Sequence, residues 1–249
     1  MDERDTRIAH DAATEAYFDA HVPEYSVTRF AHVERFLHSH AGPGSSLIDV
    51  GCGTGNTLEH LRGATPIAHV AGLDVSSACL ARTRERLGCR TYQGSIYDPR
   101  VVEAIGDRFD FALLSAVLHH LIGRTRSESR HYAQLAVQHA ARLLKPGGHV
   151  LVVEPVFYPE RAMDAVFYVK KAVSRVTARR IPILGYWNNI GAPVVSYYTH
   201  EQLVEMVGSA GGLAIRERHV DPVKSHALAG RFIRRTGTTL IAQLEPAAA

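Results

Sequence analysis

The chain has 249 residues, of which 46% are hydrophobic and 21% are charged, a composition typical of a folded domain and unlike that of a disordered chain. Its 28 basic and 25 acidic residues leave a net charge of +3, too small to indicate nucleic acid as a partner. No run is apolar enough to span a membrane, and the three cysteines lack CxxC spacing, so we expect a soluble protein in the cytoplasm.

The N-terminal segment predicts helices. From Asp11 to His40, apolar residues recur at three- and four-residue steps, interrupted by Pro23. We therefore expect two short helices before the first strand.

Strands and helices then alternate as far as Pro155. The expected strands cover residues 46–50, 69–75, 89–94, 109–114 and 149–155, and the expected helices cover 56–62, 76–87 and 128–144. Most of these strands are apolar throughout, which is typical of strands buried on both faces. The alternation therefore predicts a parallel sheet with helices on both sides.

The alternation stops after Pro155. A helix is expected over residues 160–178, with one apolar stripe formed by Val166, Val169, Val173 and Val176. A helix over 199–209 and strands over 213–220 and 238–245 follow. The last two strands succeed each other with no expected helix, which predicts an antiparallel pair at the end of the sheet.

A glycine-rich turn follows the first expected strand, in the stretch SLIDVGCGTGNTL. The spacing of Gly51, Gly53 and Gly55 is one residue shorter than in the dinucleotide fingerprint GxGxxG. Asp49, just before the turn, would repel a pyrophosphate and favours a cationic ligand. The alternative is that the glycines serve only a tight connection between strand and helix.

A second acid sharpens the ligand prediction. Asp74 ends the second expected strand, 21 residues after Gly53, about the spacing at which a carboxylate accepts hydrogen bonds from both ribose hydroxyls. Together with Asp49, it favours a ribonucleoside that carries a cationic tail. S-adenosylmethionine, with its ammonium and sulfonium groups, fits that description.

Several motifs taken together resemble the class I S-adenosylmethionine-dependent methyltransferases: DVGCGTG with Asp74, QGSIYD, FDFALLSAVLHHL and LLKPGGHVLVVEP. They are most similar to the small-molecule branch that includes the ubiquinone and menaquinone methyltransferases. The resemblance covers residues 42–155, and more weakly 199–220. It implies an α/β, Rossmann-like, seven-stranded mixed sheet of order 3-2-1-4-5-7-6, with strand 7 antiparallel, helices on both faces and a small helical cap.

The resemblance also implies a division of the single domain 1–249 and a set of ligand contacts. The divisions are an N-terminal helical lid (1–41), a cofactor-binding core (42–155), a substrate cap (156–198) and the end of the core sheet (199–249). The positions that match the family's cofactor-binding motifs are Asp49, Gly51, Cys52, Gly53, Gly55, Asp74, Val75, Gly94, Ser95, Ile96 and Ser115. Cys52 is expected as a small packing residue in the turn, and Ser95 stands where the family often has Asp.

Catalytic candidates lie just beyond the expected fourth and fifth strands. His119 and His120 are candidates for a general base, because a histidine suits proton transfer near neutral pH. The alternative is that one of them braces the cofactor loop. Glu154 either orients a substrate hydroxyl or pairs with a neighbour. No DxD motif or carboxylate cluster indicates a metal.

In this branch the acceptor is covered by the N-terminal helices and the cap. The candidate acceptor contacts are Tyr17, Tyr25, Arg29, Tyr158, Tyr186, Trp187 and Tyr198. Half or more of the cap aromatics could instead pack the cap onto the sheet. A basic stripe on the cap helix, Lys170, Lys171, Arg175, Arg179 and Arg180, is expected on a solvated face, with attraction of an acidic acceptor or weak contact with an anionic surface as alternatives.

The resulting hypothesis is methyl transfer to oxygen or carbon of a small, partly apolar metabolite of natural-product, quinone, lipid or sugar type, by a monomer or homodimer. One alternative is a methyltransferase for RNA or protein, which the modest charge disfavours. The other is a protein of this fold that uses S-adenosylmethionine for a reaction other than methyl transfer.

Overall fold

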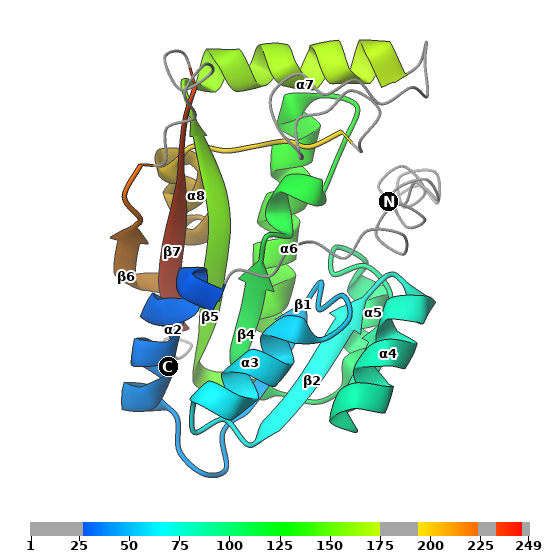
Figure 1. Cartoon of the computed structure of the whole chain (residues 1–249), viewed down its shortest axis with the longest axis vertical. Helices are drawn as coiled ribbons and strands as arrows, with labels where there is room; N and C mark the ends of the chain where they lie inside the picture. The colour runs from blue at the N-terminus through cyan, green and yellow to red at the C-terminus, as the bar shows by residue number, and fades with distance from the viewer. Residues whose placement is uncertain (1–26, 175–193, 224–232, 246–249) are drawn as a thin grey trace.

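One seven-stranded sheet runs through the computed structural model, which describes residues 27–174, 194–223 and 233–245 (Figure 1). The strand order is β3-β2-β1-β4-β5-β7-β6, with β7 antiparallel to both of its neighbours and the other pairs parallel. The strands are β1 (Ser46–Val50), β2 (His69–Asp74), β3 (Arg90–Gln93), β4 (Phe109–Ser115), β5 (Leu144–Tyr158), β6 (Leu213–Val220) and β7 (Arg234–Leu244). The predicted order and the antiparallel strand 7 are confirmed.

Helices cover both faces of this sheet. One face carries α2 (Ala31–His40), α3 (Asn56–Ala64) and α4 (Ser77–Leu87), and the other carries α5 (Pro99–Ile105), α6 (Arg126–Arg142) and α8 (His200–Gly208). Successive strand residues point to opposite faces, so Leu47 packs in the first layer and Ile48 in the second. This arrangement explains why the central strands carry apolar residues on both faces.

The short helix α2 belongs to the first layer. Its Val33, Phe36 and Leu37 are buried against the sheet, after the 3₁₀ turn η1 (Val27–Phe30). The described part of the predicted N-terminal lid is therefore a layer of the core.

Strand β5 is longer than predicted, and it continues through Pro155. The last residue of β5 that pairs with β4 is Val153, so Pro155 lies beyond the end of that pairing. The N–H that proline lacks is therefore not missed by a hydrogen bond to β4. Beyond that point β5 pairs only with β7 among the named strands, as far as Tyr158. This extension carries the chain to the cap helix α7 (Glu160–Ser174), which crosses the end of the molecule in Figure 1.

The buried face of α7 differs from the predicted valine stripe. Met163, Phe167 and Lys170 are buried at 5%, 0% and 3% exposure, whereas Val169 is 56% exposed. The steps of four and three residues between the buried positions are as helical as the valine spacing, and they bring the largest apolar ring of the helix inward. Val176 lies outside the described residues. Within the described ranges, no helix has both the length and the apolar character that crossing a bilayer requires.

Candidate active site at the ends of β1, β4 and β5

The glycine turn between β1 and α3 is tight on one side and open on the other. Gly51 has a φ of +76°, and a Cβ there would lie 2.3 Å from Cγ2 of Val117. Gly53 has a φ of +52°, and apart from its two chain neighbours no described residue has an atom within 4 Å of the position of its missing Cβ. The first glycine therefore lets the turn meet the segment after β4, and the second leaves room for a ligand to approach the backbone.

Asp49 is a buried acid at this turn. It is 2% exposed, and its Oδ1 has no hydrogen-bond partner among the described residues. Burial and then the charge of Asp74 raise its pKa to about 8, whereas the nearby Arg29 lowers it. On the neighbouring strand, the buried Oγ of Ser115 also has no partner within the described ranges. Two unsatisfied buried groups at adjoining strand ends suit a ligand that brings hydrogen-bond donors and positive charge.

Asp74 is fixed to the same turn by backbone groups. Its Oδ2 accepts from the N–H of Gly53 at 2.8 Å, and its Oδ1 accepts from the N–H of Ser76 at 2.9 Å. A carboxylate has about four lone-pair sites, more than these two backbone bonds use, so the half-buried Asp74 is of a type that can also bind ribose hydroxyls. Val75 follows, half-exposed, at the edge where an adenine would lie if Asp74 held the ribose.

The predicted adenine segment lies beside Asp74. The N–H of Gly94 donates to the carbonyl of Asp74 at 2.9 Å. Ser95 is half-buried, whereas the Ile96 side chain is 3% exposed and packs in the core. Asp98 caps α5, and its hydrogen bonds with Arg100 outweigh its partial burial and hold the pKa of that carboxyl below its usual range. The acid nearest to Ser95 in sequence thus already has a structural role.

Cys52 faces the protein interior. A Cβ on Gly72 of β2 would lie 2.6 Å from its Sγ, and burial raises the pKa of its thiol strongly. Its backbone N–H donates to Leu73 and its carbonyl accepts from Gly55. Cys52 is therefore placed as a packing residue.

A buried carboxylate organises the predicted catalytic residues. Oε1 of Glu154 accepts from the backbone N–H groups of Val117 and Leu118, each at 2.7 Å, and Oε2 bonds Nδ1 of His119 at 2.6 Å. Glu154 is 2% exposed and His119 is 5% exposed. Because an ionised carboxylate only accepts, Nδ1 of His119 carries a proton, and Nε2 is an acceptor in the neutral form of the ring. The pair therefore both braces the 3₁₀ turn η2 (Leu118–His120) and orients an imidazole.

Two aromatic rings lie beside this imidazole, and the charge of Lys170 acts on one of them, His120. The His119 ring stacks with Tyr197 at 5.2 Å between centroids and lies 4.1 Å from the His120 ring. Burial, followed by the charges of His119 and Lys170, lowers the pKa of His120 well below its usual value. His120 is therefore neutral at physiological pH.

The basic stripe of the cap helix differs from the prediction in its described part. Lys170 is 3% exposed, and burial lowers its pKa to about 8. Lys171 donates to the carbonyls of Gly123 and Arg124 at 2.6 and 2.9 Å. Neither lysine lies on a freely solvated face: Lys170 belongs to the buried face of α7, and Lys171 is bonded to the segment before α6. Arg175, Arg179 and Arg180 lie outside the described residues.

The predicted acceptor contacts that the structure describes, Arg29, Tyr158 and Tyr198, do not form one group. Arg29 lies close enough to Asp49 to lower its pKa, which puts it at the cofactor end. The Tyr158 hydroxyl donates to Glu201 of α8, and Tyr198 is 2% exposed within the core. Tyr17, Tyr25, Tyr186 and Trp187 lie outside the described residues.

The sequence prediction did not single out two groups near His119. Tyr197 was one of many cap aromatics, and Lys170 was assigned to the solvated stripe. The only sequence signal for Lys170 was its spacing from Met163 and Phe167, seven and three residues before it.

Comparison with known proteins identifies the fold and the family. A family model described as a methyltransferase domain matches residues 24–243. The chain is similar to the N-methyltransferase NodS from Bradyrhizobium japonicum, solved with S-adenosyl-L-homocysteine, with a TM-score of 0.58, 14% identity, and coverage of 95% of this chain and 100% of that one. At this identity the likeness shows the fold.

Two curated relatives match about half of the chain. The first is the dTDP-3-amino-3,4,6-trideoxy-alpha-D-glucopyranose N,N-dimethyltransferase of Streptomyces venezuelae, 36% identical over 129 residues, covering 51% of this chain and 49% of the relative. The second is ribosomal RNA small subunit methyltransferase C of Salmonella choleraesuis, 25% identical over 130 residues, covering 52% of this chain and 37% of the relative. The matched stretches span about half of these relatives or less.

The family match covers most of the chain, and the glycine turn with Asp49 and Asp74 suits a nucleoside with a cationic tail. The chain therefore belongs to the class I S-adenosylmethionine-dependent methyltransferases, and S-adenosylmethionine is its cofactor.

Proposed function

We propose that the protein transfers a methyl group from S-adenosylmethionine to oxygen or carbon of a small, partly apolar metabolite, with His119 as the general base. The observation that carries this proposal is the buried Glu154–His119 pair. It adjoins the cofactor turn directly, because Val117, which Glu154 holds, packs on Gly51. The base would therefore lie next to the reacting end of the cofactor.

At the cofactor end, the charges of this chain match the methionine group. Asp49 would accept from the ammonium group, which supplies the donors that its buried Oδ1 lacks. Arg29, whose charge already acts on Asp49, would bind the carboxylate, and Asp74 would hold the ribose hydroxyls. When bound, the cofactor would supply a methyl group on a sulfonium. The acceptor would attack the methyl carbon in line with the carbon–sulfur bond, and the sulfur would leave as a neutral thioether.

At the acceptor end, the side chains suit an acceptor that must lose a proton. Glu154 fixes the Nδ1 proton of His119, so Nε2 would take the proton from a hydroxyl group or an acidic carbon. Such acid–base help typically contributes about 10²- to 10⁴-fold. The buried ammonium of Lys170, close enough to act on His120, would stabilise negative charge that develops on the acceptor. Phe167 and Met163 supply the apolar contacts.

An amine acceptor is the second candidate. The observation that favours it is the similarity to the Streptomyces venezuelae relative, which is named as an N,N-dimethyltransferase. An amine that is neutral attacks without giving up a proton first, so it would not need the Glu154–His119 pair as a base. The relative that acts on ribosomal RNA makes RNA a third class to test, although the net charge of +3 gives little attraction for phosphate. We place the protein in the cytoplasm, where its three free cysteines would remain reduced.

The test is incubation with methyl-labelled S-adenosylmethionine and a metabolite extract, with RNA and protein fractions in parallel. Label in a small hydroxyl or carbon acceptor is expected. Label in an amine would support the second candidate, and label only in RNA or protein would refute both.

Two matched variants test the base. We expect His119→Gln, which keeps a donor toward Glu154, to lower kcat by about 10²-fold or more with unchanged cofactor affinity. His120→Gln should lower kcat less, because burial lowers the pKa of His120 and makes it a weak base. Equal rates for wild type and His119→Gln would exclude the base.

A further inference from the structure

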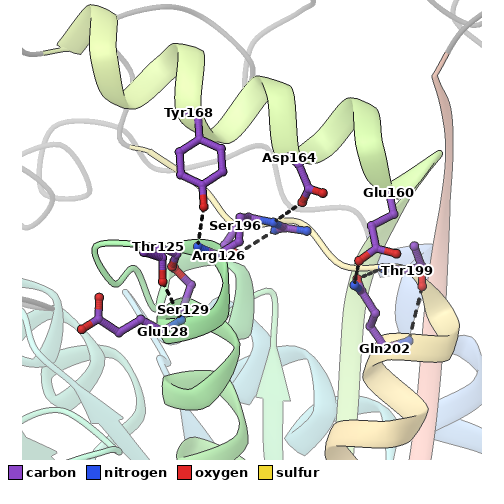
Figure 2. A network of polar contacts seen from close by, with 10 residues as sticks. All are labelled: Thr125, Arg126, Glu128, Ser129, Glu160, Asp164, Tyr168, Ser196, Thr199 and Gln202. Atoms are coloured by element: carbon purple, nitrogen blue, oxygen red, sulfur yellow. Dashed lines mark hydrogen bonds and ion pairs between the residues drawn. The ribbon is translucent and has the colours of Figure 1, made fainter.

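A second face of α7, beside the one that buries Phe167, contacts the start of α6. Asp164, Tyr168 and Lys171 recur at steps of four and three residues, so they share this face. Nε of Arg126 donates to Oδ1 of Asp164 at 2.9 Å, and the Arg126 backbone N–H donates to the Tyr168 hydroxyl at 3.5 Å. Figure 2 shows both side chains reaching down from α7 to Arg126. Lys171 adds its bonds to the carbonyls just before α6.

The guanidinium of Arg126 also holds a second segment. Its Nη1 donates to Oγ of Ser196 at 2.7 Å, and the group lies over the Tyr198 ring at 5.4 Å from the centroid. Figure 2 places Ser196 and Asp164 on different sides of the guanidinium. The backbone N–H of Ser196 in turn donates to the carbonyl of His119 at 2.8 Å. One side chain thus joins the cap helix to the segment that covers the histidines.

The junction is buried on the Arg126 side. The Arg126 side chain is 11% exposed, whereas that of Asp164 is 43% exposed. The planar guanidinium can hold two acceptors in fixed directions, which a lysine ammonium does less well. We call Arg126, Asp164 and Ser196 the latch.

We propose that Arg126 is a positioning residue for methyl transfer: the latch keeps α7 docked over the acceptor site and fixes the Ser196 backbone that holds His119. This inference rests on the proposed function for its catalytic readout. The latch acts through α7 and Ser196 and does not touch the glycine turn, so its loss should affect the acceptor and leave the cofactor bound.

The helix α6 supplies a matched control. Arg130 lies one turn after Arg126 and forms an ion pair with Glu205 of α8 instead of with Asp164. We expect Arg126→Gln to raise the acceptor KM by about tenfold or more, with the cofactor Kd within about twofold of wild type. Arg126→Lys keeps the positive charge but not the planar guanidinium, so its acceptor KM should lie between those of wild type and Arg126→Gln. Arg130→Gln should match wild type.

Wild-type KM and kcat in Arg126→Gln would overturn the proposal. An equal rise of the acceptor KM in Arg130→Gln would overturn it too, because the effect would then follow from replacing any arginine of α6. A matching loss of cofactor affinity in Arg126→Gln would also contradict it.

Hydrogen exchange on the full chain tests the latch without any acceptor. Arg126→Gln should speed exchange in residues 160–174 and 194–198 together, and leave β1 and β4 unchanged. Unchanged exchange in 160–174, or a rise in only one of the two segments, would overturn the latch. If the wild-type protein methylates no small molecule but exchange rises as expected, the proposed function fails and the latch stands.

Discussion

In the proposed site, backbone groups and two acids at strand ends would face the cofactor at the glycine turn, whereas long side chains of α7 would face the acceptor. The turn is tight at Gly51, where a side chain would collide with Val117. The inner face of α7 is built from Met163, Phe167 and Lys170, on a helix that is not part of the sheet.

From this comparison we propose that α7, and not the glycine turn, selects the acceptor. The curated relatives match about half of the chain, and their names include a dimethyltransferase of an amino sugar and a methyltransferase of ribosomal RNA. A rigid cofactor turn with a separate, exchangeable helix above it allows one donor to serve different acceptors. The variants below should therefore affect one region and spare the other.

The largest effect is expected from Phe167→Ala on α7. Phe167 is fully buried, so its truncation should lower the free energy of unfolding by about 3–5 kcal/mol and raise the acceptor KM. Denaturant unfolding and initial rates measure the two quantities. Cofactor affinity should stay near wild type, and a loss of cofactor affinity as large as the change in KM would break the separation of the two regions.

Asp74→Ala should weaken cofactor binding and leave the acceptor site intact. Two hydrogen bonds from hydroxyls to a charged group contribute about 1.5–3 kcal/mol each, so even at the lower bound the cofactor Kd should rise by roughly 10²-fold or more. The control is Asp98→Ala, which removes the α5 cap and should cost about 1 kcal/mol of stability with little change in Kd. Calorimetry that gives Asp74→Ala a wild-type Kd would contradict the ribose assignment.

Asp49 should give the cofactor-free protein a pH-dependent stability. Its pKa is 3.8 in the unfolded chain and about 8 when folded, so between these values the folded chain holds a proton that the unfolded chain has lost. Stability should therefore fall as pH rises through this window, by at most roughly 1.4 kcal/mol per pH unit from this group. Asp49→Asn should remove that fall in denaturant unfolding, and an unchanged slope in the variant would assign it to other groups.

The smallest effect is expected from Val169→Ala. Val169 belongs to the predicted apolar stripe but is 56% exposed, so its truncation should change stability by less than about 0.5 kcal/mol and leave the acceptor KM unchanged. A loss near that of Phe167→Ala would show that α7 buries the valine face instead.

Much of the fold could be predicted from sequence because its signals are local. The apolar strands, the glycine turn and the acids at 49 and 74 each lie within a short stretch, and the sheet order followed from the family resemblance. The helix α5 was missed although Asp98 and Pro99 form a cap and a first helical position, because its seven residues give little periodicity.

The acceptor side could not be read in the same way. Both the valine stripe and the Met163–Phe167–Lys170 stripe have helical spacing, and only the structure beneath α7 decides which is buried. The latch joins Arg126 to groups 38 and 70 residues away, so no local pattern marks it. The pairing of Glu154 with His119 likewise depends on β4 and β5 being neighbours, which places their ends together.

The central claim, that a buried acid at the glycine turn takes the cationic end of the cofactor, is tested most directly by proton release. Calorimetry of S-adenosylmethionine binding at about pH 6.5, in buffers of different ionisation enthalpy, should show about one proton released per cofactor, because a bound ammonium lowers the pKa of Asp49 from about 8. Asp49→Asn should bind more weakly and release none. Tight binding without proton release, or equal affinity and release in Asp49→Asn, would contradict the account.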